Sequence, residues 1–583
     1  MITLQGNPAS RGVAIGTALV YEPFQPAPWA EHISAGQADT ELQAYHRACE
    51  AAAGELEQII GQMTQAGDTK GAIFQAQRDL LDDEVIREEI ETAIQSELLP
   101  AAGCVEKVYQ AYAALLARTE DDRIRERAAD LSDVRIRLLR CLEGKPEKNL
   151  AHLTQPTVIV ARDLLPSDTA TLDRCHVLAI VTEIGGATSH SAILARSYEI
   201  PALLGVDRAT AMVHTGQTVV VDAVEGKLLL EPDSATRQTY QKKREALSRE
   251  MACAKRYRSA VPQTRDGLRV EVELNIATAG AEELANHAIA DGVGLFRTEF
   301  LYLGRETLPT EEEQLAAYQK VLAAFSGKPV VLRTMDIGGD KQLECMQLAR
   351  EENPFLGNRA LRLCLARPEV FRTQLRAALR AARDGDLRIM FPMVSGMEDI
   401  AAAKAALDEA RQSLVRDGLP FRSQVQLGVM VEIPSIALIA DLVAREVDFC
   451  SIGSNDLCQY MMAADRMNPQ VSGYYRPLHP AMLRAIGTIA QEFRRVGKEA
   501  ALCGELGGDP AGALALIGLG VHRLSMSPSA VPYVKRAICH STAADLAQLA
   551  RQAQQLPYEA DIRALFTTYL QTHQEEETEE FPC

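Results

Sequence analysis

The chain has 583 residues and a formal net charge of −18, with 24% charged and 47% hydrophobic residues. This length accommodates three or four domains, each with a full-sized core. The acidic balance argues against a long nucleic acid or an anionic membrane surface as partner, and it favours a basic protein instead.

The terminus and the cysteines indicate the compartment. The N-terminal residues lack a basic region followed by an apolar core, so we expect no signal peptide. No apolar stretch approaches the ~20 residues that a membrane span requires, so we expect no membrane insertion. Twelve cysteines are scattered without a C-x-x-C pair, which argues against zinc ribbons and a disulfide framework. Scattered thiols fit a reducing compartment, so we expect a cytoplasmic protein.

The first part of the chain combines a short strand with a long helical segment. Residues 1–23 contain a strand-like run bounded by glycines, which has to pair with strands that come later. In residues 24–147 glycine becomes sparse, and apolar residues recur at helical spacing from Leu42 to Ile59. We predict a helical bundle inserted into the domain that the first strand begins. Its acidic cluster, Asp82 to Glu91, is either a solvated helix face or a partner surface.

Residues 148–232 return to strand periodicity and, with residues 1–23, predict a discontinuous α/β domain. Within it, the sequence GGATSHSAILAR (185–196) follows an apolar run and predicts a tight turn and then a helix. His190 then lies in the first helical turn, where backbone N–H groups and the helix dipole stabilise an anion. A neutral imidazole, with a pKa of about 6.5, is a workable nucleophile for a phosphoryl group. A histidine that only caps or packs is the alternative.

The second half of the chain predicts a barrel behind a linker. Residues 233–260 are polar and charged and predict an exposed linker helix, which would let the His190 domain move. Residues 261–572 alternate strand-like and helical runs, which predicts a (β/α)8 TIM barrel. The eight strand-like runs are 268–276, 291–297, 329–335, 388–394, 426–433, 447–453, 499–503 and 521–526. Residues 573–583 are expected to be a disordered acidic tail.

Polar side chains end five of the predicted barrel strands. The residues at or just after these ends are Arg297, Arg333, Glu432, Asn455, Asp456, Arg466 and Cys503. Each alone could be structural, but strand ends converge on one rim of a barrel, where chemistry takes place. Arginines bind phosphate and carboxylate through two oxygens at once, and paired carboxylates offer hard ligands to Mg²⁺. The set predicts a small, doubly anionic metabolite held with a divalent metal.

Long motifs make the chain resemble enzyme I of the phosphoenolpyruvate:sugar phosphotransferase system over nearly its whole length. These motifs are GGATSHSAILARSYEIPALLG, GVGLFRTEFLYL, VLRTMDIGGDK, EENPFLGNRALR, GVMVEIPS, SIGSNDLCQY and CGELGGDP. The resemblance implies a phosphoenolpyruvate-protein phosphotransferase. In that reaction a swivelling phosphohistidine domain takes a phosphoryl group from phosphoenolpyruvate, pyruvate leaves, and the group passes to a histidine of the phosphocarrier protein HPr as the first step of sugar uptake.

The resemblance also implies roles for individual residues. His190 becomes phosphorylated, and Cys503 protonates the enolate carbon to give pyruvate. Glu432 and Asp456 bind Mg²⁺, with Mn²⁺ as an alternative. The residues that bind phosphoenolpyruvate are Arg297, Arg333, Asn455, Asp456 and Arg466. It further implies that HPr, which has a basic face, docks on the helical subdomain, and that the barrel forms a homodimer.

Four positions bear on how closely the family pattern is kept. Gln77 stands where a histidine is common, Ala187 where a larger side chain can sit, and Asn358 where a bulky residue is frequent. Thr169 either orients the active imidazole or caps a helix. The identity of the carrier protein and the downstream sugar stay open.

Two other functions remain as alternatives. A regulatory paralogue that serves a specialised carrier is kept open by Gln77 and Ala187. An ATP-dependent synthase or dikinase that makes phosphoenolpyruvate shares the swivelling domain. However, the chain has no G-x-x-x-x-G-K-[ST] motif, and its N-terminal third is helical rather than a glycine-rich α/β domain.

Overall fold

The computed structural model divides into two compact units, residues 1–249 and 250–583. It describes residues 2–580 except 22, 23, 25, 27, 30, 31, 67–70, 118–121, 146–149, 151, 152, 154, 165–171, 173, 174, 186–190, 193, 194, 196, 197, 199, 304, 306, 339–345, 347, 349, 350, 467 and 469. Among the helices of these described residues, none combines the length and apolar character needed to cross a bilayer.

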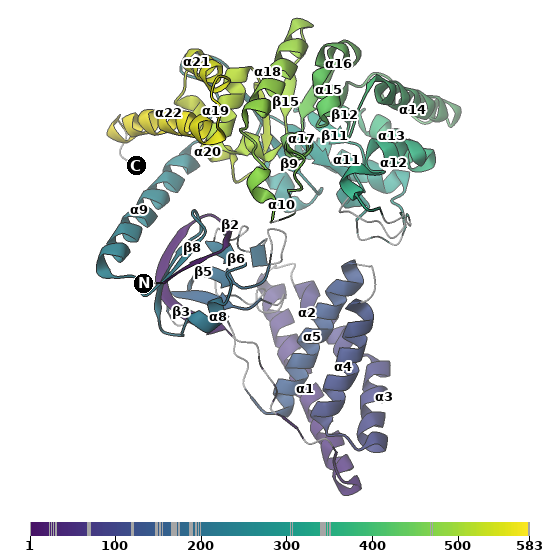
Figure 1. Ribbon diagram of the computed structural model, residues 1–583. Helices are drawn as coiled ribbons and strands as arrows, with labels where there is room; N and C mark the ends of the chain where they lie inside the picture. Colours follow the sequence, from purple (N-terminus) through teal and green to yellow (C-terminus); the bar gives the residue numbers. More distant parts are fainter. Residues whose placement is uncertain are drawn as a thin grey trace. The chain divides into compact units, whose positions relative to one another are not determined.

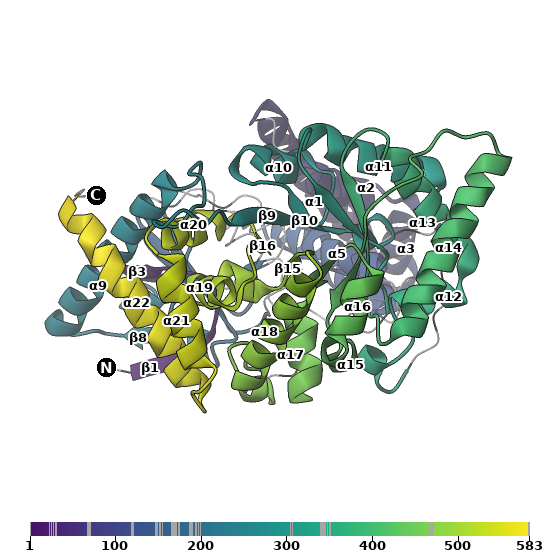
Figure 2. The same ribbon diagram turned by 90° about the horizontal axis from the view of Figure 1, so that it is seen from above.

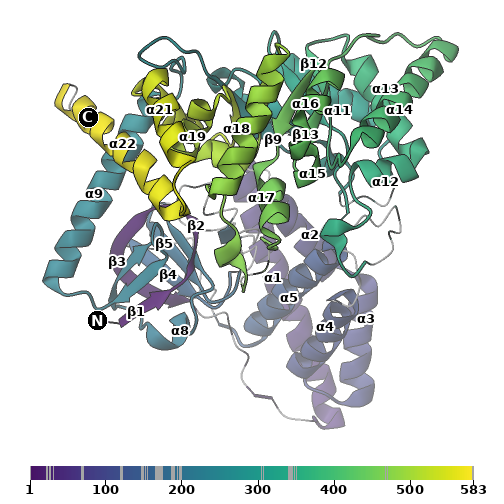
Figure 3. The ribbon, with the colours of Figure 1, turned by 45° about the horizontal axis from the view of Figure 1, so that its top comes forward.

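The first unit contains a mixed sheet built from both ends of the discontinuous domain. Its strands are β1 (Ile2–Gln5), β2 (Asn7–Ser10), β3 (Val13–Tyr21), β4 (Thr157–Ala161), β5 (Val177–Thr182), β6 (Ala202–Leu204), β7 (Thr218–Asp222) and β8 (Lys227–Leu230). They pair in the order β1-β8-β7-β3-β4-β5-β6-β2, with β3 to β6 parallel and the remaining pairs antiparallel. The early strand β3 therefore lies at the centre of the sheet, between β7 and β4 (Figure 3).

A helical bundle is inserted between β3 and β4 and has its own apolar core. Its helices are α1 (Ala38–Ala66), α2 (Gly71–Leu81), α3 (Glu84–Thr92), α4 (Ala101–Ala117) and α5 (Asp122–Leu142). They run side by side in Figure 1. Gln77 of α2 is fully buried, and its amide nitrogen donates a hydrogen bond to Asp133 Oδ2 at 2.9 Å. A partner docked on the bundle surface would not touch Gln77.

The predicted acidic cluster is partly engaged within the bundle. Asp83 caps α3, because its Oδ1 accepts hydrogen bonds from the backbone N–H groups of Val85 and Ile86. Glu89 accepts a hydrogen bond from the Tyr112 hydroxyl at 2.9 Å. These contacts fix the ends of a short helix whose outer face stays acidic.

The second unit is a closed barrel of eight parallel strands. They are β9 (Glu271–Ile276), β10 (Val293–Arg297), β11 (Val330–Arg333), β12 (Leu387–Phe391), β13 (Leu427–Val431), β14 (Phe449–Ile452), β15 (Ala500–Leu502) and β16 (Arg523–Met526). Each strand lies within or next to a predicted run, so the predicted (β/α)8 fold is confirmed. Helix α9 (Ser234–Arg256) leads into the barrel and contains the boundary between the units.

Helices surround the barrel strands (Figure 2). They are α10 (Ala281–Leu284), α11 (Glu311–Ala324), α12 (Leu361–Ala366), α13 (Pro368–Ala381), α14 (Met397–Arg416), α15 (Pro434–Leu438), α16 (Ala440–Glu446), α17 (Ser454–Met462), α18 (Pro480–Arg495), α19 (Pro510–Leu519), α20 (Val531–Cys539), α21 (Ala543–Ala553) and α22 (Glu559–Glu580). Short α8 (Ala209–Met212) belongs to the first unit. Apolar side chains between strands and helices form one continuous core.

One expectation, about the C-terminal residues, needs correction. Helix α22 continues through Glu580, so the expected disordered tail is wrong for residues 573–580. Phe566 anchors this helix in the barrel core, and its glutamates and glutamines are good helix formers. Among the described cysteines, Cys253 is disulfide-bonded and the others are free, and a single bridge does not make a disulfide framework.

Candidate active site

The predicted barrel residues lie at the carboxyl ends of the parallel strands, where the loops of such a barrel form its mouth. Arg297 ends β10 and pairs in register with Arg333, which ends β11. Glu432 follows β13, α17 begins directly after β14, and Cys503 follows β15. The structure brings together Arg297, Arg333, Glu432, Asn455, Asp456, Arg466 and Cys503. His190 lies outside the described residues, as do Thr169 and Ala187.

Arg333 is held by carboxylates from two strands. It is buried, and it contacts Glu299 beyond β10 and Asp336 Oδ2 at 3.0 Å. Burial disfavours its charge, but Glu299 and Asp336 raise the pKa of Arg333 above its usual value. The guanidinium therefore stays charged inside the barrel, ready for an anionic ligand.

Arg359 is a site residue that the sequence reasoning misses. Its Nη2 donates hydrogen bonds to both oxygens of Asp336, at 3.0 and 3.1 Å, and its Nη1 donates to Asp456 Oδ1 at 3.3 Å. Arg466 reaches the other oxygen of Asp456 at 3.5 Å. Arg359 follows β11 by many residues, so no strand end marks it. Its only signal is its place in the motif EENPFLGNRALR.

Glu432 has one engaged and one unengaged oxygen. Its Oε1 accepts a hydrogen bond from the backbone N–H of Met393 at 2.5 Å. Its Oε2 is buried and has no hydrogen-bond partner among the described residues. Burial, together with the negative charges of Asp456 and Asp336, raises the pKa of Glu432 to about 8. A Cβ on Gly453 would lie 2.9 Å from Oε2, so glycine keeps the space beside this oxygen open.

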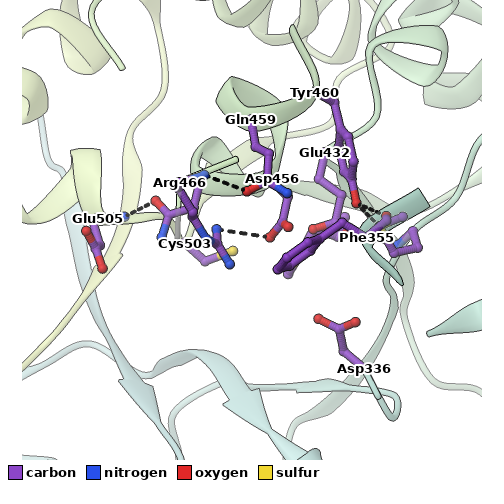
Figure 4. A network of polar contacts seen from close by, with 12 residues as sticks. Asp336, Phe355, Glu432, Asp456, Gln459, Tyr460, Arg466, Cys503 and Glu505 are labelled. Atoms are coloured by element: carbon purple, nitrogen blue, oxygen red, sulfur yellow. Dashed lines mark hydrogen bonds and ion pairs between the residues drawn. The ribbon is translucent and has the colours of Figure 1, made fainter. Parts of the chain in front are cut away.

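Hydrogen bonds hold Asn455 and Arg466 in place, and Figure 4 labels their partners, Glu505 and Gln459. Asn455 Oδ1 accepts a hydrogen bond from the backbone N–H of Glu505 at 3.0 Å. The backbone N–H of Arg466 donates to Gln459 Oε1 at 3.3 Å. The side chains of Asn455 and Arg466 are thereby placed on neighbouring sides of the mouth.

Cys503 lies below these residues at the top of the apolar barrel interior. It packs with Leu295, Met430 and Phe449, and its thiol donates to the Ile452 carbonyl oxygen at 3.8 Å. Burial raises the pKa of Cys503 to about 11, against smaller lowering effects of Ser451 and Arg333. The thiol is therefore protonated at neutral pH and holds a proton that it can donate.

The carboxylates of the mouth suit a magnesium ion that shares its coordination with substrate. Among the described residues, no three His, Cys, Asp or Glu side chains come together as a complete metal site. Glu432 and Asp456 nevertheless follow the neighbouring strands β13 and β14, and Glu432 Oε2 is buried without a hydrogen-bond partner among the described residues. Mg²⁺ is commonly bound by one or two carboxylates plus substrate phosphates and water. The two residues fit this kind of ion.

Comparisons with known families place this site in a class. Residues 252–543 match the family described as PEP-utilising enzyme, PEP-binding domain. Residues 5–127 match the N-terminal domain of PEP-utilising enzymes, and residues 153–226 match their mobile domain. The fold and the site thus define a PEP-utilising enzyme.

Curated relatives narrow the class further. The phosphoenolpyruvate-protein phosphotransferase of Bacillus sp. (strain S) is 42% identical over 91% of both chains. The proteins of the same name from Staphylococcus carnosus and Haemophilus influenzae are 41% and 38% identical, each over 97% of this chain and 99% of its own. The chain belongs to the phosphoenolpyruvate-protein phosphotransferase family, the enzyme I transferases of the phosphotransferase system, and the resemblance to enzyme I is confirmed.

Proposed function

We propose that this chain transfers a phosphoryl group from phosphoenolpyruvate to His190 and then to a histidine of an HPr-type carrier, releasing pyruvate. We also propose that it works in the cytoplasm, with Mg²⁺ or Mn²⁺, as a homodimer joined through the barrel. The observation that carries the proposal is the barrel mouth, which sets arginines, two carboxylates and a protonated thiol around one space (Figure 4). These groups complement the negative charges of phosphoenolpyruvate and can supply the proton that its enolate product needs.

Arginines at the mouth bind and orient the substrate in this proposal. Arg297 ends β10, Arg333 ends β11 and Arg466 follows α17, and each presents a planar set of donors. They would hold the carboxylate and phosphate of the substrate and stabilise the charge on the transferring group. Glu432 and Asp456 would hold the divalent metal, which neutralises negative charge on the phosphoryl oxygens.

Cys503 completes the reaction by supplying a proton. Loss of the phosphoryl group leaves an enolate, and its carbon must gain a proton to become pyruvate. The S–H bond of Cys503 breaks, the proton goes to that carbon, and a thiolate remains on Sγ. Arg333 lowers the pKa of Cys503 and so favours that thiolate.

The carrier would dock on the helical bundle. A groove of about 370 Å³ between α3 and α4 is lined by Glu88, Glu89 and Glu97, with Lys107 as its basic member. This negative lining supports a basic partner, as the resemblance to enzyme I implies. His190 would then visit two places in turn, the barrel mouth and the docked carrier.

Labelling with radioactive phosphoenolpyruvate tests the proposal. Acid-labile label should appear on the full chain, vanish in His190→Ala and persist in His214→Ala, an exposed histidine of the same unit. Label that persists in His190→Ala would refute the assignment. Chasing the labelled protein with purified HPr-type carriers should move the label, and failure to label any carrier would remove the second step.

A second variant tests the proton donor. Cys503→Ala should slow pyruvate release by about 10²–10⁴-fold, the usual contribution of a positioned acid. Binding of Mn²⁺, followed by its electron paramagnetic resonance, should change little. Unaffected turnover would remove the acid role of Cys503.

A further inference from the structure

A tyrosine hydroxyl connects two segments of the barrel mouth (Figure 4). Tyr460 lies on α17, one helical turn after Asp456. Its hydroxyl donates a hydrogen bond to the main-chain oxygen of Phe355 at 2.5 Å and accepts one from Arg359 Nη1 at 3.2 Å. Phe355 belongs to a short 3₁₀ helix, η6 (Pro354–Leu356), between β11 and α12. Tyr460 therefore ties the segment after β11 to the helix after β14.

The donors of Arg359 are divided between three partners. Nη2 and Nε are directed at Asp336, at 3.0 to 3.3 Å. Nη1 is shared between Asp456 Oδ1 at 3.3 Å and the Tyr460 hydroxyl at 3.2 Å. The Phe355 ring adds a face contact, with its centroid 5.8 Å from the guanidinium carbon. Tyr460 is thus the neutral partner of an arginine that otherwise binds carboxylates.

The backbone around Arg359 adopts an uncommon conformation. Ala360 has a φ of 53° and a ψ of −124°, which a residue with a side chain adopts only when its surroundings enforce it. Gly338 lies directly against Arg359, because a Cβ at position 338 would come within 2.5 Å of Arg359 Cβ. The placement of Arg359 therefore depends on contacts that hold the 353–360 segment, and the Tyr460–Phe355 hydrogen bond is one of them.

The demands on Asp456 change when substrate binds. In the structure its two oxygens serve Arg359 and Arg466. The proposed function requires the same carboxylate to bind a metal ion, so its hold on Arg359 must weaken at that moment. The Tyr460 hydroxyl, in contrast, donates to a main-chain oxygen and is not required to bind the metal ion, so its contact with Arg359 can persist.

We propose that Tyr460 is a positioning residue for phosphoryl transfer: its hydroxyl keeps Arg359 aimed into the mouth when Asp456 turns to the substrate complex. The inference rests on the proposed function, and it adds Arg359 to the arginines that act on the transferring phosphoryl group. Tyr460 itself touches no reacting atom. Its hydroxyl also lies 3.8 Å from Met393 Sδ, but the proposed effect on the reaction passes through the shorter contact with Arg359.

The isosteric variant Tyr460→Phe removes only the hydroxyl. Tyr318→Phe is a matched control, because the Tyr318 hydroxyl also donates to a carbonyl oxygen, of Gln314 at 3.0 Å, and accepts from an amide nitrogen, of Gln374 at 3.4 Å. In single-turnover phosphorylation of the full chain, Tyr460→Phe should slow the rate at saturating phosphoenolpyruvate about tenfold. The half-saturating concentration should change less than twofold. The inference would be overturned if Tyr460→Phe changed the half-saturating concentration of phosphoenolpyruvate but not the single-turnover rate. An equal loss of rate in Tyr318→Phe would overturn it as well.

A double-mutant cycle separates positioning from general damage. In an Arg359→Gln background, adding Tyr460→Phe should change the single-turnover rate less than twofold, because the residue through which Tyr460 acts is already gone. A further tenfold loss in that background would show that Tyr460 acts independently of Arg359 and would contradict the proposal.

Hydrogen exchange of the full chain gives a readout that does not depend on catalysis. Amides of residues 353–360 should exchange faster in Tyr460→Phe than in the wild type or in Tyr318→Phe. Unchanged exchange in this segment would refute the tie between Tyr460 and Phe355. If the wild type takes no label from phosphoenolpyruvate, the proposed function fails, while the exchange result still decides whether Tyr460 holds the segment.

Discussion

The two ends of the barrel bury the same kinds of charged residue in different ways. At the amino end, Arg523 of β16 is surrounded by Glu273, by Glu271 at 2.9 Å and by Glu499 at 3.6 Å. At the mouth, Arg359 and Arg466 reach Asp456 at 3.3 and 3.5 Å.

The two sites differ in how fully their carboxylate oxygens are engaged. Three carboxylates, two on β9 and one just before β15, surround the amino-end arginine, as expected of a group that stabilises the fold. At the mouth, Arg333 and Arg359 hold Asp336 at 3.0 Å, but the pairs to Asp456 are longer. Glu432 Oε2 also has no hydrogen-bond partner among the described residues, so Asp456 and Glu432 are the carboxylates that can exchange partners for a ligand. Position at one or the other end of parallel strands thus decides whether similar residues serve stability or chemistry.

Breaking the amino-end cluster should produce the largest change in stability. Arg523→Met leaves Glu273 buried without its guanidinium partner, and removing one member of a buried pair costs about 3–5 kcal/mol. Urea unfolding of the barrel should show this loss, while phosphorylation per folded molecule stays within about twofold. Arg495→Met, which removes an exposed pair with Glu492, should cost less than about 1 kcal/mol. Equal losses in the two variants would abolish the distinction.

Removing a carboxylate from the mouth should lower activity strongly and leave stability unchanged or higher. Glu432→Gln removes a buried carboxylate whose Oε2 has no hydrogen-bond partner among the described residues. Phosphorylation by phosphoenolpyruvate should fall by about 100-fold or more, as when a group that stabilises transition-state charge is lost. The free energy of unfolding should stay the same or rise, because a carboxyl group whose ionisation burial already disfavours is replaced by a neutral amide. A variant that is destabilised yet fully active would place Glu432 with the structural residues.

The amino-end cluster should also show a pH dependence. Burial raises the pKa of Glu273, and Arg523 acts against that increase. Arg523→Met therefore raises the pKa of Glu273 in the folded protein further. The folded state then binds more protons than the unfolded state above the unfolded pKa of about 4.3, so stability falls as pH rises through that window. Unfolding measured at about pH 5 and pH 7.5 should show the smaller penalty at the lower pH. A penalty that grows on acidification would contradict this assignment.

The sequence predicts the barrel better than it predicts the mouth, for a physical reason. Buried parallel strands are continuous apolar runs, so each strand from β9 to β16 could be located from its own residues. Once the strands were located, the candidate site residues at their carboxyl ends could be predicted as well. Arg359 could not be found in the same way, because its position depends on the positive φ of Ala360 and on Gly338 leaving space beside it.

The helical bundle offers the smallest expected effect. Gln77 departs from the histidine common in the family, but it is fully buried and donates to Asp133. An imidazole N–H can donate to the same oxygen, so Gln77→His should change the free energy of unfolding by less than about 1 kcal/mol. Phosphoryl transfer to the carrier should stay within about twofold of the wild type. Glu88→Gln, on the exposed lining of the acidic groove, should slow that transfer more, most clearly at low salt. If Gln77→His slows transfer more than Glu88→Gln, the bundle interior rather than its acidic surface determines which carrier is accepted.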